Sequence, residues 1–194
     1  ISKQIQDTCK KPTLSNPSFI SLDKKHGKLK NGNYDFRVTG PNIYWLGLDQ
    51  NDDWGNGDYI EYPSARRIRD ALISAKELGA NTVRCHTLGI SSGRPKTLYP
   101  NLDGSFNDTA FYTIDKVIEI AKELDLKLII PLTDAYNYYH GGYYNFCESC
   151  DDSTLSKNPW DMTTGCKDFF ITDSSSNVRF KKYIAYVLDH EANG

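Results

Sequence analysis

Apolar and polar residues alternate along the chain in blocks whose spacing changes in a regular way after residue 40. Short, mostly apolar runs predict buried strands, and longer segments with apolar residues three and four positions apart predict amphipathic helices. The strands are expected at 42–48, 81–89 and 126–132. The helices are expected at 64–78, 108–124 and about 176–190. The resulting order, β-α-β-α-β-α, is typical of a parallel sheet covered by helices.

Each expected helix has one apolar face that would pack on such a sheet. In the first helix, with Ser64 as its N-cap, this face is Ile68, Ala71, Leu72, Ala75 and Leu78. In the second helix it is Phe111, Ile114, Val117, Ile118, Ala121 and Leu124. In the third it is Phe180, Ile184, Val187 and Leu188. The segments "AKELGANTV" (75–83) and "AKELDLKLI" (121–129) also form a small internal repeat, because both combine a helix end, a tight turn and the start of an apolar strand.

The connections from strand to helix distinguish between two parallel folds. A doubly wound sheet and a (β/α)8 TIM barrel both fit the order of elements, but a Rossmann nucleotide site needs a Gly-rich turn directly between strand and helix, and the sequence has none. The connections are instead roughly 15 to 40 residues long, against a usual two to six. Long loops suit a barrel, which builds its site at the carboxyl ends of the strands. We expect an α/β chain that supplies roughly the first three βα units of a (β/α)8 TIM barrel.

The chain divides into two expected regions. Residues 1–17 are polar and proline-punctuated, which indicates an N-terminal strap, and residues 18–194 would form the barrel portion. A short β-hairpin that turns at Asn31-Gly32 is expected before the first barrel strand. A cysteine-containing insertion is expected at about 146–173.

Composition excludes some classes of partner. The net charge is −2 and the positive charges are scattered, so the sequence has no basic face for nucleic acid or an anionic membrane. No apolar stretch approaches the ~20 residues that span a bilayer. With 39% hydrophobic and 25% charged residues, the chain can build one sizeable core.

The cysteines indicate an oxidising compartment. They are Cys9, Cys85, Cys147, Cys150 and Cys166. The last three crowd a Ser/Asp/Asn-rich loop and Cys9 lies in the polar N-terminal segment, so we expect these four in disulfides, with a zinc site or free thiols as alternatives. Cys85 lies in an apolar strand and should stay reduced and buried. The acceptor Asn107-Asp108-Thr109 adds an expected glycan at Asn107, and together these features predict a secreted or extracellular protein.

Polar and aromatic residues follow the expected strands where each one ends. The third strand runs into "LTDAYNYYHGGYYNF" (132–146), the first ends near Trp45, and the second carries Arg84 and His86. In a barrel these ends meet, and rings mixed with amides, carboxylates and imidazoles are suited to bind sugars. The alternative is that the rings only pack their own loops.

Three segments carry a family resemblance. "GPNIYWLGLDQND", "YPSARRIRDALISAKELGANTVRCHTLGIS" and "FNDTAFYTIDKVIEIAKELDLKLIIPLTDAYNYYHGG" resemble the N-terminal half of fungal-type glycoside hydrolase family 5 proteins related to endo-β-1,4-mannanases. The resemblance covers about residues 28–145. It implies a (β/α)8 barrel, retaining hydrolysis of a β-1,4-linked polysaccharide with mannan as the expected substrate, no cofactor and no metal. The family's two catalytic glutamates would lie beyond residue 194, in the remaining C-terminal part of the barrel.

The resemblance also implies roles for single residues. Arg84 matches the arginine that hydrogen-bonds the nucleophile, and as a buried cation it would need a carboxylate partner, although an ordinary ion pair within the barrel is the alternative. The expected substrate-binding residues are Trp45, His86, Asp134, Tyr138, His140 and Trp160. Of these, Asp134 would orient a neighbour, and Trp160 lies in the insertion, which would either lengthen the groove or cover the site. A non-catalytic extracellular glycan-binding or structural protein derived from the same barrel remains the alternative function.

Overall fold

The computed structural model describes residues 19–50, 60–86, 88, 96–101, 103–134, 139–146 and 174–190. The chain forms two compact units, Ile1–Val38 and Thr39–Gly194. The unit that holds the described helices begins at Thr39.

The described part of the first unit is a small antiparallel sheet. It consists of β1 (Ser21–Asp23), β2 (Lys28–Asn31) and β3 (Tyr34–Phe36) in that order. Asn31 pairs with Tyr34, so the two loop residues of the second hairpin are Gly32 and Asn33, one position later than expected. Gly32 has a φ of +59°, a left-handed conformation that glycine adopts without a Cβ penalty. The expected hairpin is confirmed and a third strand extends it.

The second unit contains parallel strands in chain order. Strand β6 (Thr82–Arg84) pairs in parallel with β7 (Lys127–Ile129), and Asn42 forms a parallel bridge to Arg84 on the other side of β6. Three segments that are separated by helices in the sequence thus lie side by side in one direction, as the β-α-β pattern predicted.

The first expected strand is shorter than the sequence suggested. Only Asn42 bridges to β6, and residues 44–47 turn away. The chain then forms β4 (Asp49–Gln50), which pairs antiparallel with β5 (Ile60–Glu61), a pairing that the sequence did not predict. The apolar residues of 42–48 are still buried, because Leu46 and Leu48 are fully covered without belonging to a strand.

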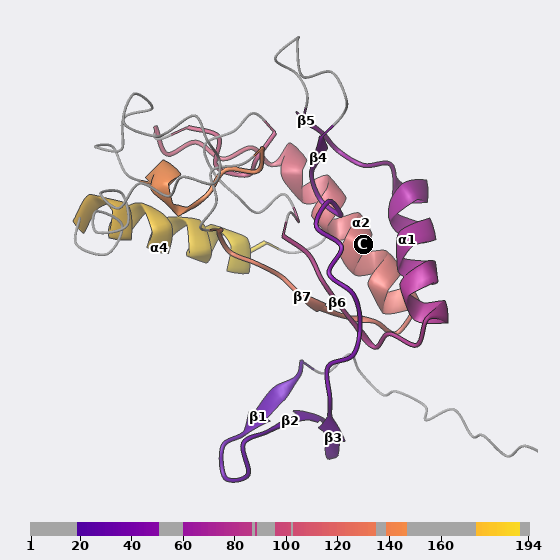
Figure 1. Cartoon of the computed structure of the whole chain (residues 1–194). Coiled ribbons are helices and arrows are strands. Elements are labelled where there is room, and N and C mark those ends of the chain that lie inside the picture. The colour runs from indigo at the N-terminus through magenta and orange to yellow at the C-terminus, as the bar shows by residue number, and fades with distance from the viewer. Residues whose placement is uncertain are drawn as a thin grey trace, which may run out of the picture. The chain divides into compact units, whose positions relative to one another are not determined.

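The helices lie close to their expected ranges. They are α1 (Ala65–Glu77), α2 (Thr109–Glu123) and α4 (Ser174–Leu188), with a short 3-10 helix, η1 (Tyr143–Phe146), before the last. The Ser64 hydroxyl accepts a hydrogen bond from the backbone N–H of Arg67, which confirms the expected N-cap. Helices α1 and α2 pack side by side, α2 packs on β7, and α4 packs against η1 (Figure 1). None of the described helices is long and apolar enough to cross a membrane.

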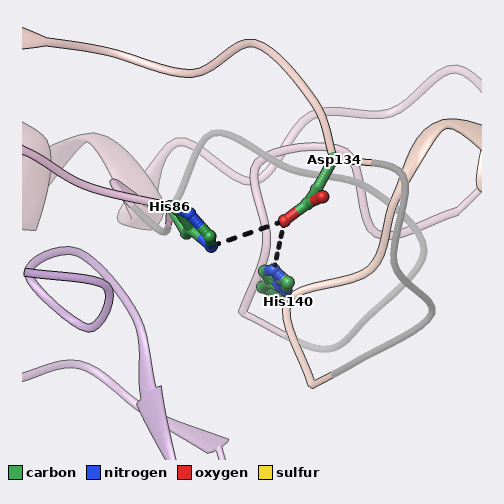
Figure 2. A group of neighbouring side chains, drawn as sticks. All are labelled: His86, Asp134 and His140. Atoms are coloured by element: carbon green, nitrogen blue, oxygen red, sulfur yellow. Dashed lines mark hydrogen bonds and ion pairs between the residues drawn. The ribbon is translucent and has the colours of Figure 1, made fainter. Parts of the chain in front are cut away.

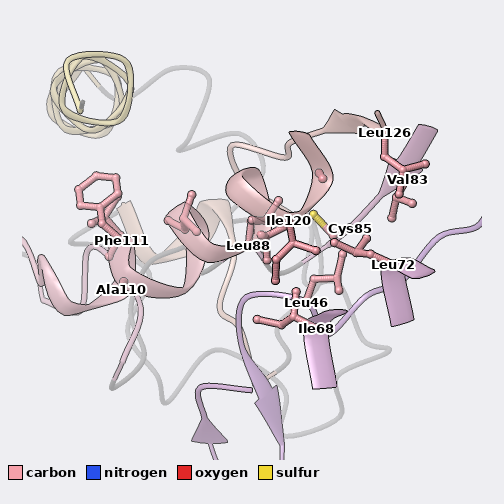
Figure 3. Packing of buried hydrophobic residues seen from close by; sticks show 14 of the residues in the cluster. Leu46, Ile68, Leu72, Val83, Cys85, Leu88, Ala110, Phe111, Ile120 and Leu126 are labelled. Atoms are coloured by element: carbon pink, nitrogen blue, oxygen red, sulfur yellow. The ribbon is translucent and has the colours of Figure 1, made fainter. Parts of the chain in front are cut away.

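The main core lies between the helices and the strands, where Figure 3 shows residues of α1, α2 and β6 packed together with Leu126, which directly precedes β7. Three expected core positions are wrong: Leu78 is 87% exposed, Leu188 is 74% exposed and Ile118 is 37% exposed. Leu78 is the C-cap of α1 and Leu188 ends α4, so both lie where the helix leaves its packing surface. Helix α2 buries Ile120 where the sequence favoured Ile118.

Helix α4 is anchored by a residue that the apolar pattern did not single out. The side chain of Tyr183 is fully buried, and its ring lies 5.2 Å from that of Phe146 in an edge-on arrangement. Burial raises the pKa of the Tyr183 phenol well above its usual value. The tyrosine therefore behaves as an apolar ring that joins α4 to η1.

The structure confirms that Cys85 is reduced and buried. It is a free, fully buried cysteine among aliphatic side chains (Figure 3). Desolvation raises the pKa of its thiol to about 12, although the charge of Arg84 acts in the opposite direction. The thiol is accordingly inert in the folded chain.

Candidate functional site

Two histidines and one aspartate meet at the carboxyl ends of the parallel strands (Figure 2). His86 lies just after β6, Asp134 lies after β7, and His140 lies in the turn before η1. Because β6 and β7 run in the same direction, their carboxyl ends reach the same edge of the sheet, and polar residues that follow them come together there. The sequence predicted this convergence.

One carboxylate oxygen of Asp134 lies close to both imidazoles. Asp134 Oδ2 lies 3.1 Å from His140 Nε2 and 3.7 Å from His86 Nδ1. The two rings are nearly parallel, with centroids 6.4 Å apart and an interplanar angle of 6°. His140 is buried, whereas the His86 and Asp134 side chains are 32% and 21% exposed. Asp134 therefore lies between the two imidazoles, one side of the cluster can be reached from solvent, and the expected orienting role of Asp134 stays a prediction.

Tyr139, which no sequence pattern singled out, fixes the cluster to the body of the unit. Its buried hydroxyl donates a hydrogen bond to the Leu48 carbonyl at 3.1 Å, and its ring stacks on His140 with centroids 5.2 Å apart. The Asp134 carbonyl accepts a hydrogen bond from the Tyr143 N–H at 2.9 Å. The run of tyrosines in the sequence already indicated that aromatic rings gather in this loop. Composition alone, however, cannot distinguish a ring that anchors the loop from one that faces a ligand.

Arg84 and His86 lie on the same side of the strand. Successive strand residues point to opposite faces, and the exposure alternates accordingly: Arg84 is exposed, Cys85 is buried and His86 is partly exposed. Ile129, the register partner of Arg84, is also 42% exposed. The face opposite the helix-covered core thus carries these side chains, and in a closed barrel it becomes the interior.

The expected burial of Arg84 is wrong for this chain. In the part of the chain that the structure describes, its Nη1 donates to Asn42 Oδ1 at 3.1 Å, so an amide and not a carboxylate is its partner there. The physical reason is the position of Arg84 on β6. Val83 is buried on the face that packs against the helices, and Arg84 lies on the opposite face.

Trp45 has a packing role. It is partly buried against the main core, and the Arg67 guanidinium lies over its ring, 4.1 Å from the centroid. Arg67 also pairs with the buried carboxylate of Asp49. One ring face is therefore covered by a cation held in place, which favours the packing interpretation of Trp45 and leaves at most the other face for a sugar.

Asn107 is engaged within the fold. Its Nδ2 donates to the Tyr62 hydroxyl at 3.1 Å and to the Thr97 carbonyl at 3.2 Å, and the Tyr62 hydroxyl donates in turn to the Lys96 carbonyl at 2.8 Å. A glycan on this nitrogen would break a partly buried network. The nitrogen that would carry the glycan is therefore engaged in the fold, and the expected glycosylation at Asn107 stays a prediction.

Several predicted residues lie outside the described ranges. They are Tyr138, Trp160, Cys9, Cys147, Cys150 and Cys166. The sugar contacts of the first two, the disulfides, and the insertion at about 146–173 stay predictions.

Comparison with known proteins finds similar sequences and similar folds. No family model matches the sequence. The chain is similar to two Arabidopsis thaliana proteins that are provisionally named mannan endo-1,4-beta-mannosidase P and mannan endo-1,4-beta-mannosidase 4, at 27% and 28% identity over 138 residues. The aligned region is 70% of this chain and 31% of each relative, so the chain spans about a third of the length of the curated relatives it matches.

The solved structures that resemble the chain show its fold. A glycoside hydrolase family 5 mannosidase from Rhizomucor miehei superimposes with a TM-score of 0.69 at 18% identity, over 90% of this chain and 44% of that one. An endo-1,4-beta-mannanase from the same organism gives a TM-score of 0.64 at 20% identity, over 91% and 43%. The chain has the fold of part of a (β/α)8 barrel. A variant of the mannosidase was solved in complex with mannosyl-fructose.

Proposed function

We propose that this chain is the N-terminal portion of a secreted, fungal-type family 5 glycoside hydrolase that cleaves β-1,4-linked mannan with retention of configuration. The observation that carries the proposal is the meeting of His86, Asp134 and His140 at the strand ends of a partial barrel. Relatives named for mannan hydrolysis align over most of the chain and support the same substrate class.

The cluster has the chemistry that sugar hydroxyls require. Imidazole nitrogens donate or accept hydrogen bonds, and a carboxylate accepts them, so the group can bind hydroxyls that both donate and accept. Asp134 fixes the ring orientations, and His86 is exposed enough to meet a ligand. Arg84 lies on the same side of β6 and would extend this polar surface along the barrel interior.

The catalytic pair is assigned to the rest of the barrel. A retaining glycosidase needs two carboxyl groups about 5–5.5 Å apart, one as acid/base and one as nucleophile. The described cluster contains one carboxylate, that of Asp134, and two imidazoles already engage it. We therefore assign a binding and positioning role to this chain and place both catalytic glutamates beyond residue 194, with Arg84 directed at the nucleophile.

The test is hydrolysis by the full-length native protein. We expect it to release reducing sugar from β-mannan faster than from cellulose or xylan, and proton NMR should show that the first-formed product keeps the β-configuration. Arg84→Ala should lower kcat on mannan by at least about 100-fold, which is the scale of losing a preorganised charge contact at the reacting centre. Arg66→Ala is the matched control, because Arg66 is exposed on α1 and pairs only weakly with Asp70.

Two results would contradict the proposal. An inverted product would exclude the retaining mechanism, and binding of mannan without any hydrolysis would favour a non-catalytic glycan-binding protein derived from the same barrel.

A further inference from the structure

We infer that His86, Asp134 and His140 form a binding site for one divalent transition-metal ion of the zinc class. The inference stands on the geometry of the cluster and does not depend on the proposed hydrolysis. Each residue offers one ligand atom, and these atoms all lie within 4.8 Å of one another although they come from three separate segments of the chain.

The ligand atoms suit a borderline-soft cation. Two imidazole nitrogens and one carboxylate oxygen are the donors that Zn²⁺ takes in three-ligand sites, at about 2.0–2.2 Å each. Neighbouring ligands around a tetrahedral ion of this size are about 3.3 Å apart. The observed separations from Asp134 Oδ2, 3.1 Å to His140 and 3.7 Å to His86, bracket that value. The separation from Asp134 to His86 has to shorten by a few tenths of an ångström, and the two histidine nitrogens, which lie within 4.8 Å of each other, have to reach the same spacing.

The surroundings allow this adjustment. His140 is held by its buried position, by the stacked Tyr139 ring and by Asp134. His86 is partly exposed just after the end of β6, so a rotation of its side chain can bring its nitrogen toward the other two ligands. One side of the site is thus preformed and the other can close on the ion. Water would fill the remaining coordination position.

The other histidines show what an ordinary pair looks like in this chain. The chain has four histidines; His26 pairs with Asp23 at 2.8 Å, and His190 pairs with Asp115 at 2.9 Å. Each of these pairs joins one imidazole to one carboxylate. Among the described residues, the cluster at the strand ends is where three such ligands gather. It combines one negative charge with two nitrogen ligands, and this charge attracts a doubly charged ion.

An ion bound there would compete with a sugar. Both would use the same nitrogen and oxygen atoms. The metal would therefore reversibly inhibit the binding of a ligand at the strand ends. A chelator should restore access. This effect would occur whether or not the full-length protein is hydrolytic, because it concerns occupation of the site.

The experiment is a titration of metal-free, full-length protein with Zn²⁺ and separately with Co²⁺. We expect one ion per chain at this site by calorimetry, and visible d–d absorption of bound Co²⁺ without the near-ultraviolet charge-transfer band that thiolate ligands produce. His86→Gln and Asp134→Asn should each weaken binding at least about 10-fold. His190→Gln is the matched control and should bind as the native protein does.

The outcomes separate the alternatives. Unchanged affinity in both His86→Gln and Asp134→Asn, or no binding of either ion, would overturn the inference. A thiolate charge-transfer band that persists in His86→Gln would overturn it as well, because it would place the metal on cysteines. Circular dichroism of each variant shows that the fold is retained. Hydrolysis of mannan is measured separately. If the protein does not hydrolyse mannan, the titration still shows whether the metal binds.

Discussion

The side chain of Asp134 shows how much one residue can organise at the end of a strand. Its carboxylate orients both imidazoles, and its backbone carbonyl receives the Tyr143 N–H. One oxygen of this carboxylate lies against both imidazoles and can hold them in place. This is the local reason for giving Asp134 a positioning role rather than a catalytic one.

Gly40 is the position where a single added methyl group should do the most damage. A Cβ built there would lie 1.8 Å from the Thr82 carbonyl oxygen, and the φ of +155° is unfavourable for other residues. Gly40→Ala should therefore force the 39–42 segment away from β6 and lower the free energy of unfolding by at least about 2 kcal/mol. Thermal denaturation of the full-length protein measures this.

Gly79→Ala is the matched comparison for that variant. Gly79 also has a positive φ, +87°, but a Cβ added there would have no neighbouring atom within 4 Å. The substitution should cost only about 1 kcal/mol of backbone strain. Equal losses in the two variants would show that the close approach to β6 is not what requires Gly40.

The burial of Cys85 predicts how its thiol reacts with alkylating reagents and how its ionisation affects stability at high pH. Its pKa is raised to about 12 in the folded chain, above the ordinary value of about 9, because burial penalises the thiolate. Below pH 9 the thiol is neutral in both the folded and the unfolded chain, and burying it carries no electrostatic penalty. As the pH rises from 9 toward 12 the unfolded thiol ionises while the folded one does not, so the free energy of unfolding falls. We expect no alkylation of Cys85 by iodoacetamide at pH 8 in the native protein and rapid alkylation in urea. Peptide mapping distinguishes it from the other cysteines, and finding Cys85 in a disulfide would contradict its buried position directly after β6.

The exposed sheet of the first unit offers a second titration. Both Lys28 and Lys30 donate to the Asp35 carboxylate and lower its pKa to about 2. Because the folded pKa lies below the ordinary value of 3.8, the stabilising effect is complete above about pH 4 and is lost as the pH falls toward 2. Carbon NMR of the Asp35 carboxyl should give a midpoint near 2 that rises in Lys28→Ala. A midpoint near 3.8 in the native protein would contradict the pairing.

At the scale of elements, the small sequence repeat corresponds to a repeated helix ending. In α1 the N–H of Ala80 donates to the Ala75 carbonyl and that of Gly79 to Lys76. In α2 the N–H of Leu126 donates to the Ala121 carbonyl and that of Asp125 to Lys122. Both are Schellman motifs, which satisfy the last carbonyls of a helix and turn the chain into the next strand. The sequence "AKEL" followed by a left-handed residue thus specifies the step from helix to parallel strand.

This repeat predicts a stabilising substitution. The left-handed position is Gly79 in the first copy, but Asp125, with φ of +50°, in the second. A residue with a Cβ is strained there, so Asp125→Gly should raise the free energy of unfolding by up to about 1 kcal/mol. Chemical denaturation of the full-length protein measures the change, with Asp189→Gly after α4 as the control. A loss of stability would show that the Asp125 side chain contributes more than its backbone strain costs.

At the scale of the whole molecule, the described parallel strands do not complete a sheet. Two strands and one bridge cannot close an eight-stranded barrel, and Ile129 and Ile130 are 42% and 39% exposed at the end of β7. We predict that residues 1–194 alone do not unfold in one cooperative transition and that they bind a hydrophobic dye. Calorimetry of the isolated, monomeric segment tests this, and a sharp cooperative melt would contradict it.

Local sequence determined the helices of this protein. The spacing of Ile68, Leu72 and Ala75, together with the Ser64 cap and Gly79 beyond the end, specifies α1 almost to the residue. Helical hydrogen bonds join residues four apart, so the information that sets a helix lies within the helix and its caps. The order of helices and strands could be predicted from the same kind of local pattern, and a helix between two strands favours the parallel direction of β6 and β7.

Tertiary structure alone decided which side chains meet. Nothing near Trp45 in the sequence indicates that Arg67 covers its ring, and nothing near His140 indicates that Tyr139 reaches the Leu48 carbonyl. Likewise, the exposure of Arg84 depends on which face of β6 the helices cover. Such contacts join residues far apart in the chain, and their geometry follows from strand pairing and helix packing, which no local pattern encodes. The sequence could therefore place His86, Asp134 and His140 at neighbouring strand ends, whereas only the packed fold determined that a single carboxylate oxygen holds both imidazoles.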